Sequence, residues 1–218
     1  MSSGVLQGIA AVTMVVDHTG MALFPNEVWL RWIGRLSFPL FVFLLTEGFV
    51  HTASRKKYLL RLGIFGAISE VPYQLFVGMA YGTGWQIPCQ NVFFELMAAF
   101  LALWCAEKGG AWLLGTAGLV AAAELLGMDY GAYGILLALC FTLFRGSRVG
   151  VVISLGLCTA LYCGAHQSLT QAWAISAALP LIFYNGKRGK RLPRYFLYVF
   201  YPAHLAILIL IRRACWGG

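Results

Sequence analysis

Apolar runs long enough to cross a membrane follow one another along almost the whole chain. A helix needs about 20 mostly apolar residues to cross a hydrocarbon core of about 30 Å. About nine such runs are expected, near residues 4–24, 35–51, 57–79, 91–107, 111–127, 131–145, 149–164, 168–184 and 194–213. Only 11% of the residues are charged, whereas a soluble domain carries about 25%. These features predict a polytopic membrane protein.

The predicted fold class is an all-α transmembrane helix bundle. Lipid offers no hydrogen-bond partners, so only helices and closed barrels span a membrane, and these runs are too long and too uniformly apolar for barrel strands. Because the connections are short, residues 1–218 are expected to form a single integral membrane domain. The first run is not interpreted as a cleavable signal peptide, because no Lys or Arg precedes Arg31 and the run carries Asp17 and His18.

Basic residues concentrate in the loops that share a side with the N-terminus. With nine spans, these loops carry Arg55, Lys56, Lys57, Lys108, Arg145, Arg148, Lys187, Arg188, Lys190, Arg191 and Arg194, and the opposite loops carry Arg31, Arg35, Arg212 and Arg213. The positive-inside rule then predicts a cytoplasmic N-terminus, as in a multi-pass protein of the plasma membrane. The net charge of +8 is attributed to this topology and to contact with membrane lipid, and in part to a phosphate-bearing cytosolic ligand. Nucleic acid is not expected as a partner.

Several carboxylates interrupt the apolar runs. Each costs about 2.5–3.5 kcal/mol at the centre of a span on insertion scales. The residues within spans are Asp17, Glu47, Glu70, Glu95 and Glu124, with Asp129 at a boundary. So many buried acids predict a polar cavity inside the bundle, and the alternative for any one of them is a structural hydrogen bond between helices.

Ionisable groups of both signs converge on one level in the outer half of the membrane. Asp17 and His18 lie about 20 Å along the first span at a rise of about 1.5 Å per residue, and His204 lies near the midplane of the last span. Because adjacent helical residues point about 100° apart, Asp17 is expected to pair with Arg35 or another neighbouring helix, which leaves His18 free to act as a general base. The alternative is that both histidines only bridge helices. No metal site is expected, because the six cysteines form no Cys-x-x-Cys pair.

Six stretches occur in an order that resembles the TraX family of membrane proteins. They are "MVVDHTGM", "RWIGRLSFPLFVFLLTEGFVHT", "KKYLLRLGIFGAISEVPYQL", "NVFFEL", "DYGAYGILL" and "YFLYVFYPAHLAIL", and the resemblance covers residues 5 to about 210. The namesake of this family is linked to N-terminal acetylation of conjugative pilin, and the family looks like a distant relative of membrane acyltransferases that use cytosolic acyl-CoA. The resemblance implies that His18 is the catalytic histidine, with Arg35, Asn91, Asp129 and His204 as further site residues.

The predicted activity is therefore transfer of an acetyl or other acyl group from acyl-CoA to an amine or hydroxyl that arrives from the outer side. The acceptor, a peptide N-terminus, a glycan or a small molecule, stays open, as does an acyl-histidine intermediate. The predicted catalytic residues are His18, Asp17, His204, Arg35 and Asp129, and the predicted substrate-binding residues are Asn91, Glu95 and Tyr201. The predicted phosphate-binding residues are Arg55, Lys56, Lys57, Arg61, Lys187 and Arg188. For Arg61, snorkelling to lipid phosphate is the alternative.

Two other functions remain as alternatives. A proton-coupled small-molecule transporter also uses buried Asp, Glu and His residues, although such proteins often contain structural repeats and no repeat is found by inspection. A purely structural membrane scaffold is the third interpretation, and it does not explain why ionisable groups gather at one depth.

Overall fold

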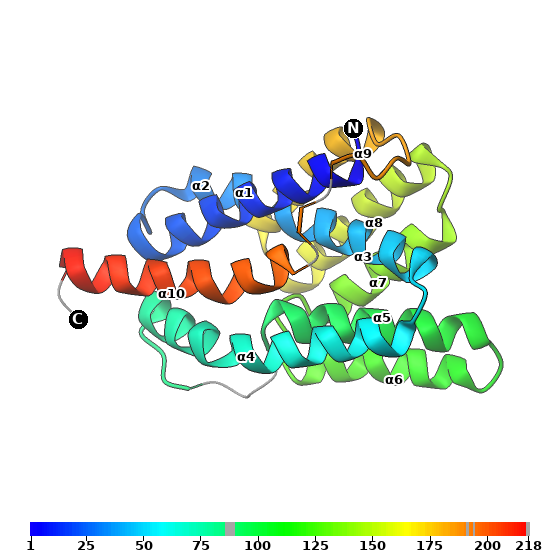
Figure 1. Cartoon of the computed structure of the whole chain (residues 1–218), viewed down its shortest axis with the longest axis horizontal. Helices are drawn as coiled ribbons and strands as arrows, with labels where there is room; N and C mark the ends of the chain where they lie inside the picture. The colour runs from blue at the N-terminus through cyan, green and yellow to red at the C-terminus, as the bar shows by residue number, and fades with distance from the viewer. Residues whose placement is uncertain (86–89, 191, 194, 217–218) are drawn as a thin grey trace.

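The computed structural model describes residues 1–85, 90–190, 192–193 and 195–216, and all regular structure among them is helical. The elements are α1 (Ser3–Leu23), α2 (Val28–Gly34), α3 (Ser37–His51), α4 (Arg55–Tyr81), α5 (Val92–Lys108), α6 (Trp112–Leu125), α7 (Ala132–Leu143), α8 (Arg148–His166), the 3-10 helix η1 (Leu169–Ala177), α9 (Ala178–Ile182) and α10 (Phe196–Trp216) (Figure 1). The predicted all-α class is confirmed for these residues. Arg191 and Arg194, counted above as inner-side basic residues, lie outside the described part.

Five helical segments in the described part are long and apolar enough to cross a membrane. They are Ser3–Leu23, Val28–His51, Arg55–Tyr81, Arg148–His166 and Phe196–Cys215. Three further apolar segments are shorter, namely Trp112–Leu125, Ala132–Leu143 and Leu169–Ile182. At about 1.5 Å per residue the shortest of these covers only about 18 Å, so length alone supports fewer spans than the nine predicted.

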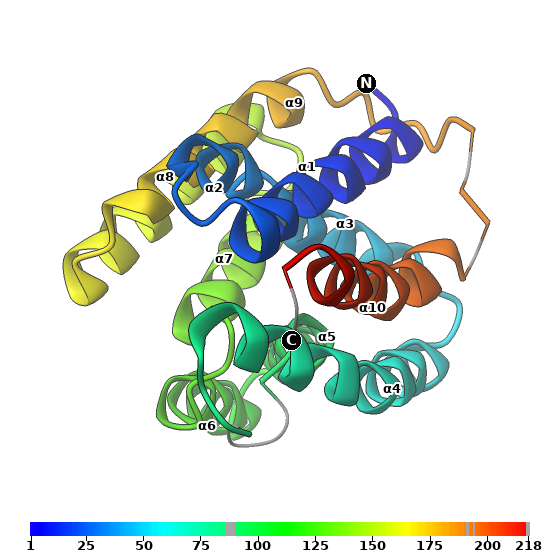
Figure 2. The same ribbon diagram turned by 90° about the vertical axis from the view of Figure 1, so that its left-hand side faces the viewer.

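Helix α3 lies at the centre of the bundle. It packs against α1, α5, α7 and η1, and its buried residues include Phe38, Leu40, Val42 and Leu45. Figure 2 views the bundle nearly end-on and shows α10 between α1 and α4, both of which it contacts. The α1, α3, α4, α5 and α10 helices therefore surround the interior in which the polar residues lie.

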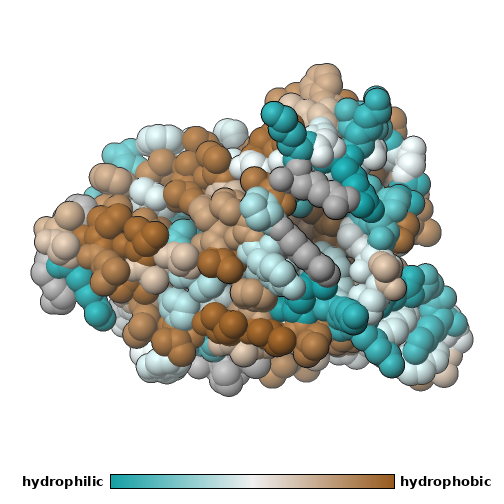
Figure 3. All heavy atoms as spheres, viewed as in Figure 1, coloured by the Kyte–Doolittle hydropathy of each residue, from teal (hydrophilic) through white to brown (hydrophobic). Residues whose placement is uncertain are grey.

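The outer faces of the long helices are apolar, which is the reverse of a water-soluble bundle. Large apolar residues exposed on α4 include Leu60, Ile64, Ile68, Val71 and Leu75, and those on α8 include Val149, Ile153, Leu157 and Leu161. Their spacing of three or four residues places each set on one side of its helix. Hydrophilic side chains gather at the end of the bundle that is on the right in Figure 3, while apolar side chains dominate the rest of that face. This surface suits a lipid environment with water at the ends.

Gly134 provides a test of how tightly α7 packs against its neighbours. A Cβ at this buried residue would overlap Glu95 Oε1 on α5 and come within 2.8 Å of Phe38 Cζ on α3. We expect Gly134→Ala to destabilise the protein by about 1–3 kcal/mol, the usual cost of overpacking. The matched control is Gly156→Ala in α8, where no neighbouring atom lies within 4 Å of the new Cβ, and where the better helix propensity of Ala adds about 0.5–1 kcal/mol. Thermal unfolding in detergent measures both changes, and equal midpoints for the two variants would contradict this packing.

Candidate functional site

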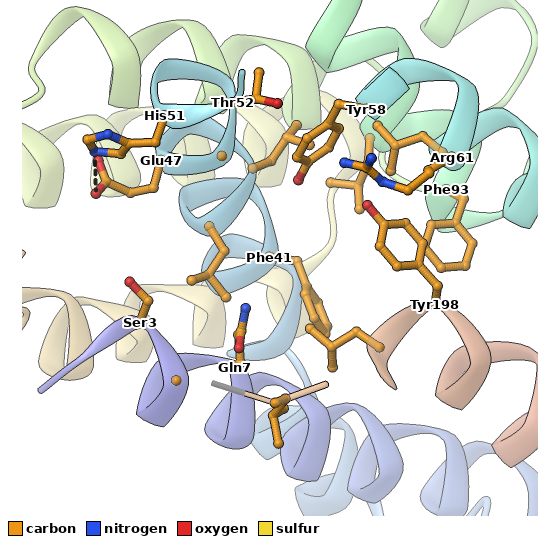
Figure 4. Close-up of a pocket in the computed structure, with 18 of the residues that line it drawn as sticks. Ser3, Gln7, Phe41, Glu47, His51, Thr52, Tyr58, Arg61, Phe93 and Tyr198 are labelled. Carbon is orange, nitrogen blue, oxygen red and sulfur yellow. Dashed lines mark ion pairs between the residues drawn. The ribbon is translucent and has the colours of Figure 1, made fainter. Parts of the chain in front are cut away.

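Two cavities lie inside the bundle. The larger has a volume of about 700 Å³ and reaches the end where α1 begins and α3 ends. Figure 4 shows Ser3 and Gln7 on one side of this cavity and Tyr58 and Arg61 on the other. The smaller cavity has a volume of about 30 Å³ and is lined by Met14, Asp17, His18, Gly34, Ser37, Phe38, Phe41, Val92, Asp129, Tyr130 and Tyr201. Four of these residues, Met14, Phe41, Val92 and Tyr201, also line the larger cavity, so the two spaces adjoin.

A pair of histidines joins α1 to α10 at the smaller cavity. His18 Nδ1 lies 2.6 Å from His204 Nε2, and His204 Nδ1 lies 2.9 Å from the carbonyl oxygen of Phe200. A carbonyl oxygen only accepts, so His204 Nδ1 donates to it, and Nε2 of a neutral His204 then accepts the proton of His18 Nδ1. The remaining nitrogen, His18 Nε2, therefore carries a free lone pair. The pair gives His18 the tautomer that a general base requires.

Asp17 forms the centre of an ion cluster. Its carboxylate accepts from Arg31 Nη1 at 2.7 Å and from Arg35 Nη2 at 2.8 and 2.9 Å. The predicted pairing of Asp17 with Arg35 is confirmed, and Arg31 is an additional partner. Gly34 allows this close contact, because a Cβ there would overlap the Asp17 side chain. Since Asp17 faces α2 and α3, the adjacent His18 turns towards α10.

The rim of the smaller cavity carries two further polar residues. Asp129 follows α6, is exposed, and contributes to the lining. Its backbone N–H donates to Gln90 O at 3.2 Å, which fixes the loop. The next residue, Tyr130, stacks on Phe38 with ring centroids 3.5 Å apart. Asp17, His18, Asp129 and Tyr201 thus line one space, whereas Arg35 and His204 lie outside its lining; the roles expected for these residues stay predictions.

Asn91 and Glu95 lie outside the linings of both cavities. Asn91 caps α5, since its Oδ1 accepts from Phe93 N at 3.1 Å, and its Nδ2 donates to Gly66 O at 2.9 Å and Glu70 Oε2 at 2.6 Å. Glu95 is completely buried beside Gly134. Asn91 thus joins α5 to α4, whereas both Glu95 carboxylate oxygens are buried without a hydrogen-bond partner among the described residues. Tyr201, in contrast, lines both cavities.

Of the six basic residues predicted to bind phosphate, only Arg61 and Arg188 line the larger cavity. The Arg61 guanidinium lies 5.2 Å from the ring centroid of Tyr58. Arg55 instead pairs with Glu107 on α5. The remaining three, Lys56, Lys57 and Lys187, are exposed residues outside the lining.

Several site residues gave no signal in the sequence. Met14, Phe41 and Val92 are apolar residues within apolar runs, and only the fold shows that they line both cavities.

In the lining of the larger cavity, Glu47 accepts from Arg145 Nε and from Tyr184 Oη, both at 2.9 Å. Glu47 Oε2 also lies 3.9 Å from Nε2 of His51, four residues later on the same helix. Within the described residues, no group of three or more His, Cys, Asp or Glu side chains is placed to hold a metal ion.

This fold and site define a helical membrane protein in which a part-buried histidine pair lies at the smaller of two adjoining cavities. The TraX family model, described as "TraX protein", matches residues 2–212, so the chain belongs to the TraX family.

Two curated relatives illustrate the match. The chain is 30% identical to the "Probable fimbrial assembly protein FimC, serogroup H1" of Dichelobacter nodosus, over 93% of this chain and 92% of that protein. It is 29% identical to "Protein TraX" of Escherichia coli, over 94% of this chain and 84% of that protein. No solved structure matches the chain significantly.

Substitution of Asp17 tests the ion cluster. The Asp17 side chain is 8% exposed and that of Arg35 is 13% exposed, so Asp17→Asn leaves two guanidinium groups unpaired in a poorly solvated site. We expect a loss of about 3–5 kcal/mol in the free energy of unfolding, as for other broken buried pairs. The control is Glu107→Gln, because the Glu107 side chain is 49% exposed and exposed pairs contribute about 0–1 kcal/mol. Chemical or thermal unfolding in detergent measures both, and a similar stability for the two variants would refute the structural role of Asp17.

Proposed function

We propose that this protein is a membrane-embedded acyltransferase that moves an acetyl or other acyl group from cytosolic acyl-CoA to an amine or hydroxyl reached from the outer side. The observation that carries the proposal is that the larger cavity adjoins the smaller one, which His18 of the histidine pair lines. A donor can enter through the larger cavity and an acceptor through the smaller one, and both then meet at His18. Membership of the TraX family supports the same assignment.

The larger cavity suits a donor of the size of acyl-CoA. Its volume of about 700 Å³ lies within the range of about 300–1,000 Å³ typical of small-molecule sites. Arg61 and Arg188 offer guanidinium groups to the phosphates. Along α1 the lining runs from Ser3 to Met14, which is about 16 Å at about 1.5 Å per residue. The slender pantetheine arm of CoA, which carries the thioester, would extend along this part of α1 towards His18.

The transfer then requires one base and one oxyanion donor. His18 Nε2 accepts the proton of the acceptor as its nitrogen or oxygen attacks the thioester carbonyl carbon. The hydroxyl of Tyr201, or the Arg35 guanidinium, stabilises the oxyanion, where fixed dipoles in a dry site are most effective. The C–S bond breaks, and the proton passes from His18 to the departing sulfur. Asp17 and His204 position His18, and Asp129 at the rim contacts the acceptor.

The proposal includes an orientation with nine spans and a cytoplasmic N-terminus in the plasma membrane. In that arrangement the wide end of the larger cavity faces the cytosol, where acyl-CoA is found. The shorter helices α6 and α7 pack against α5, which supports their placement within the membrane. Basic residues around Lys56 would then lie near anionic lipid on the inner surface.

Thiol labelling in whole cells tests this orientation. We expect a membrane-impermeant thiol reagent to label Arg213→Cys at the end of α10 but not Lys56→Cys near the start of α4, in a background in which the six native cysteines are replaced by alanine. Both residues are exposed, so permeabilised cells serve as the control and both sites should then react. The reverse pattern in intact cells would show that the N-terminus faces outwards.

The acceptor is proposed to be a pilus or fimbrial subunit. One relative carries the name of a probable fimbrial assembly protein and the family's namesake is linked to pilin acetylation. A glycan or a small molecule stays as an alternative acceptor.

Titration calorimetry with acetyl-CoA tests the donor site. We expect saturable binding, and about tenfold or greater weakening in Arg61→Gln, because a hydrogen bond to a charged group contributes about 1.5–3 kcal/mol. Lys108→Gln is the matched control, since Lys108 lies over Trp112 and outside the cavity. His18→Ala should still bind acetyl-CoA but release CoA thiol at least about 100-fold more slowly in native membranes, which supply the acceptor. Full activity in that variant would refute His18 as the base.

A proton-coupled small-molecule transporter is the second candidate function. It is favoured by the buried Asp17 and His204 and the part-buried His18, which could carry protons between the two cavities. Absence of acetyl-CoA binding at millimolar ligand, together with proton-driven solute uptake into proteoliposomes, would favour this alternative.

A further inference from the structure

Four residues line both cavities where the two spaces adjoin, namely Met14, Phe41, Val92 and Tyr201. We propose that they form a selectivity neck, which lets an acetyl group reach His18 and holds longer acyl groups back in the larger cavity. This inference rests on the proposed function, because it requires the larger cavity to hold the acyl-CoA donor.

The small volume of the second cavity limits the size of the acyl group that can reach His18. The larger cavity has a volume of about 700 Å³ and the smaller one about 30 Å³. A cavity needs a volume of at least about 10–15 Å³ to hold one water-sized group. The smaller cavity therefore accepts about two such groups. Beyond its carbonyl carbon, an acetyl group brings only a carbonyl oxygen and a methyl, whereas a butyryl group adds two methylenes.

The neck is built from helices rather than from a mobile loop. Met14 comes from α1, Phe41 from α3, Val92 from α5 and Tyr201 from α10. Met14 and Tyr201 are buried, and the Tyr201 ring packs edge-on against Phe93 with centroids 5.2 Å apart. Helix packing therefore fixes the width of the neck, and opening it would require separation of α1 from α10.

The far wall of the smaller cavity is equally firm. Ser37 Oγ donates to Ala10 O at 2.9 Å, which fixes α3 against α1. Phe38 is 2% exposed and stacks on Tyr130. A longer acyl chain would have to displace these groups, because close-packed interiors tolerate little extra volume. The longer acyl chain would then stay in the larger cavity, and its thioester would not reach His18.

The chain itself carries reporters on both sides of the neck. Of its four histidines, His51 lines the larger cavity, His18 lines the smaller one and bonds to His204, and His166 lies at the end of α8. Nitrogen-15 NMR of the imidazole groups in detergent-solubilised wild-type protein therefore shows separately which cavity a ligand occupies, with His166 as the internal control.

The experiment compares free CoA, acetyl-CoA and butyryl-CoA at saturating concentration. We expect all three to shift the His51 signals, and acetyl-CoA alone to shift the signals of the His18–His204 pair. In Phe41→Leu and in Met14→Ala, butyryl-CoA at the same saturating concentration should also shift the pair, because space for a single methylene in a tight pocket changes discrimination by about tenfold or more. Phe43→Leu is the matched control, because Phe43 lies on the same helix but lines neither cavity, and it should behave as wild type.

Each other outcome is decisive. A wild-type response of the His18–His204 pair to butyryl-CoA, or no response of that pair to acetyl-CoA, overturns the selectivity neck while donor binding at His51 stands. No response of His51 to any of the three ligands overturns the proposed donor site, and the neck with it. The use of two widening variants guards against one of them failing to fold.

Discussion

One carboxylate pairs with two guanidinium groups inside a largely apolar bundle, and the arrangement of the first three helices depends on these ion pairs. Asp17 binds Arg31 of α2 and Arg35 at the start of α3. A charge within lipid costs several kcal/mol unless it is paired, so these three groups exclude packings that would separate them. Gly34 is part of the same constraint, because only a residue without a side chain lets α2 approach the carboxylate.

The geometry of the candidate site follows from this ion cluster. With Asp17 directed towards α2 and α3, the following residue points about 100° away and faces α10, where His18 meets His204. The same rotation of α1 places Met14, one turn earlier, between the two cavities. The ion cluster around Asp17 thereby fixes the orientation of His18, the proposed base, and of Met14 in the neck.

The sequence predicted the helical class and most of the polar residues that gather at the smaller cavity. Apolar length and scarce charge are sufficient for the first, and the cost of a buried charge explains the second, as for Asp17. The number of spans was less predictable, because helices such as α7 are short and η1 begins as a 3-10 helix. Basic residues were also hard to assign: Arg61 lines the larger cavity, whereas Arg55, six residues earlier, pairs with Glu107. Asn91 likewise proved to cap a helix, a role that its place in a matching motif did not reveal.

By itself, then, the sequence determined that this chain is a helical membrane protein with ionisable residues inside its apolar runs, because hydropathy and charge are local properties of the chain, and six motifs in order carried its resemblance to the TraX family. Only the tertiary structure decided which of those residues meet, since His18 and His204 are 186 positions apart and come together through the packing of α1 against α10. The same holds for the two cavities and for the apolar residues between them. Met14 and Phe41 resemble any other core residue in the sequence, and their position at the neck arises from the way in which four helices leave space unfilled.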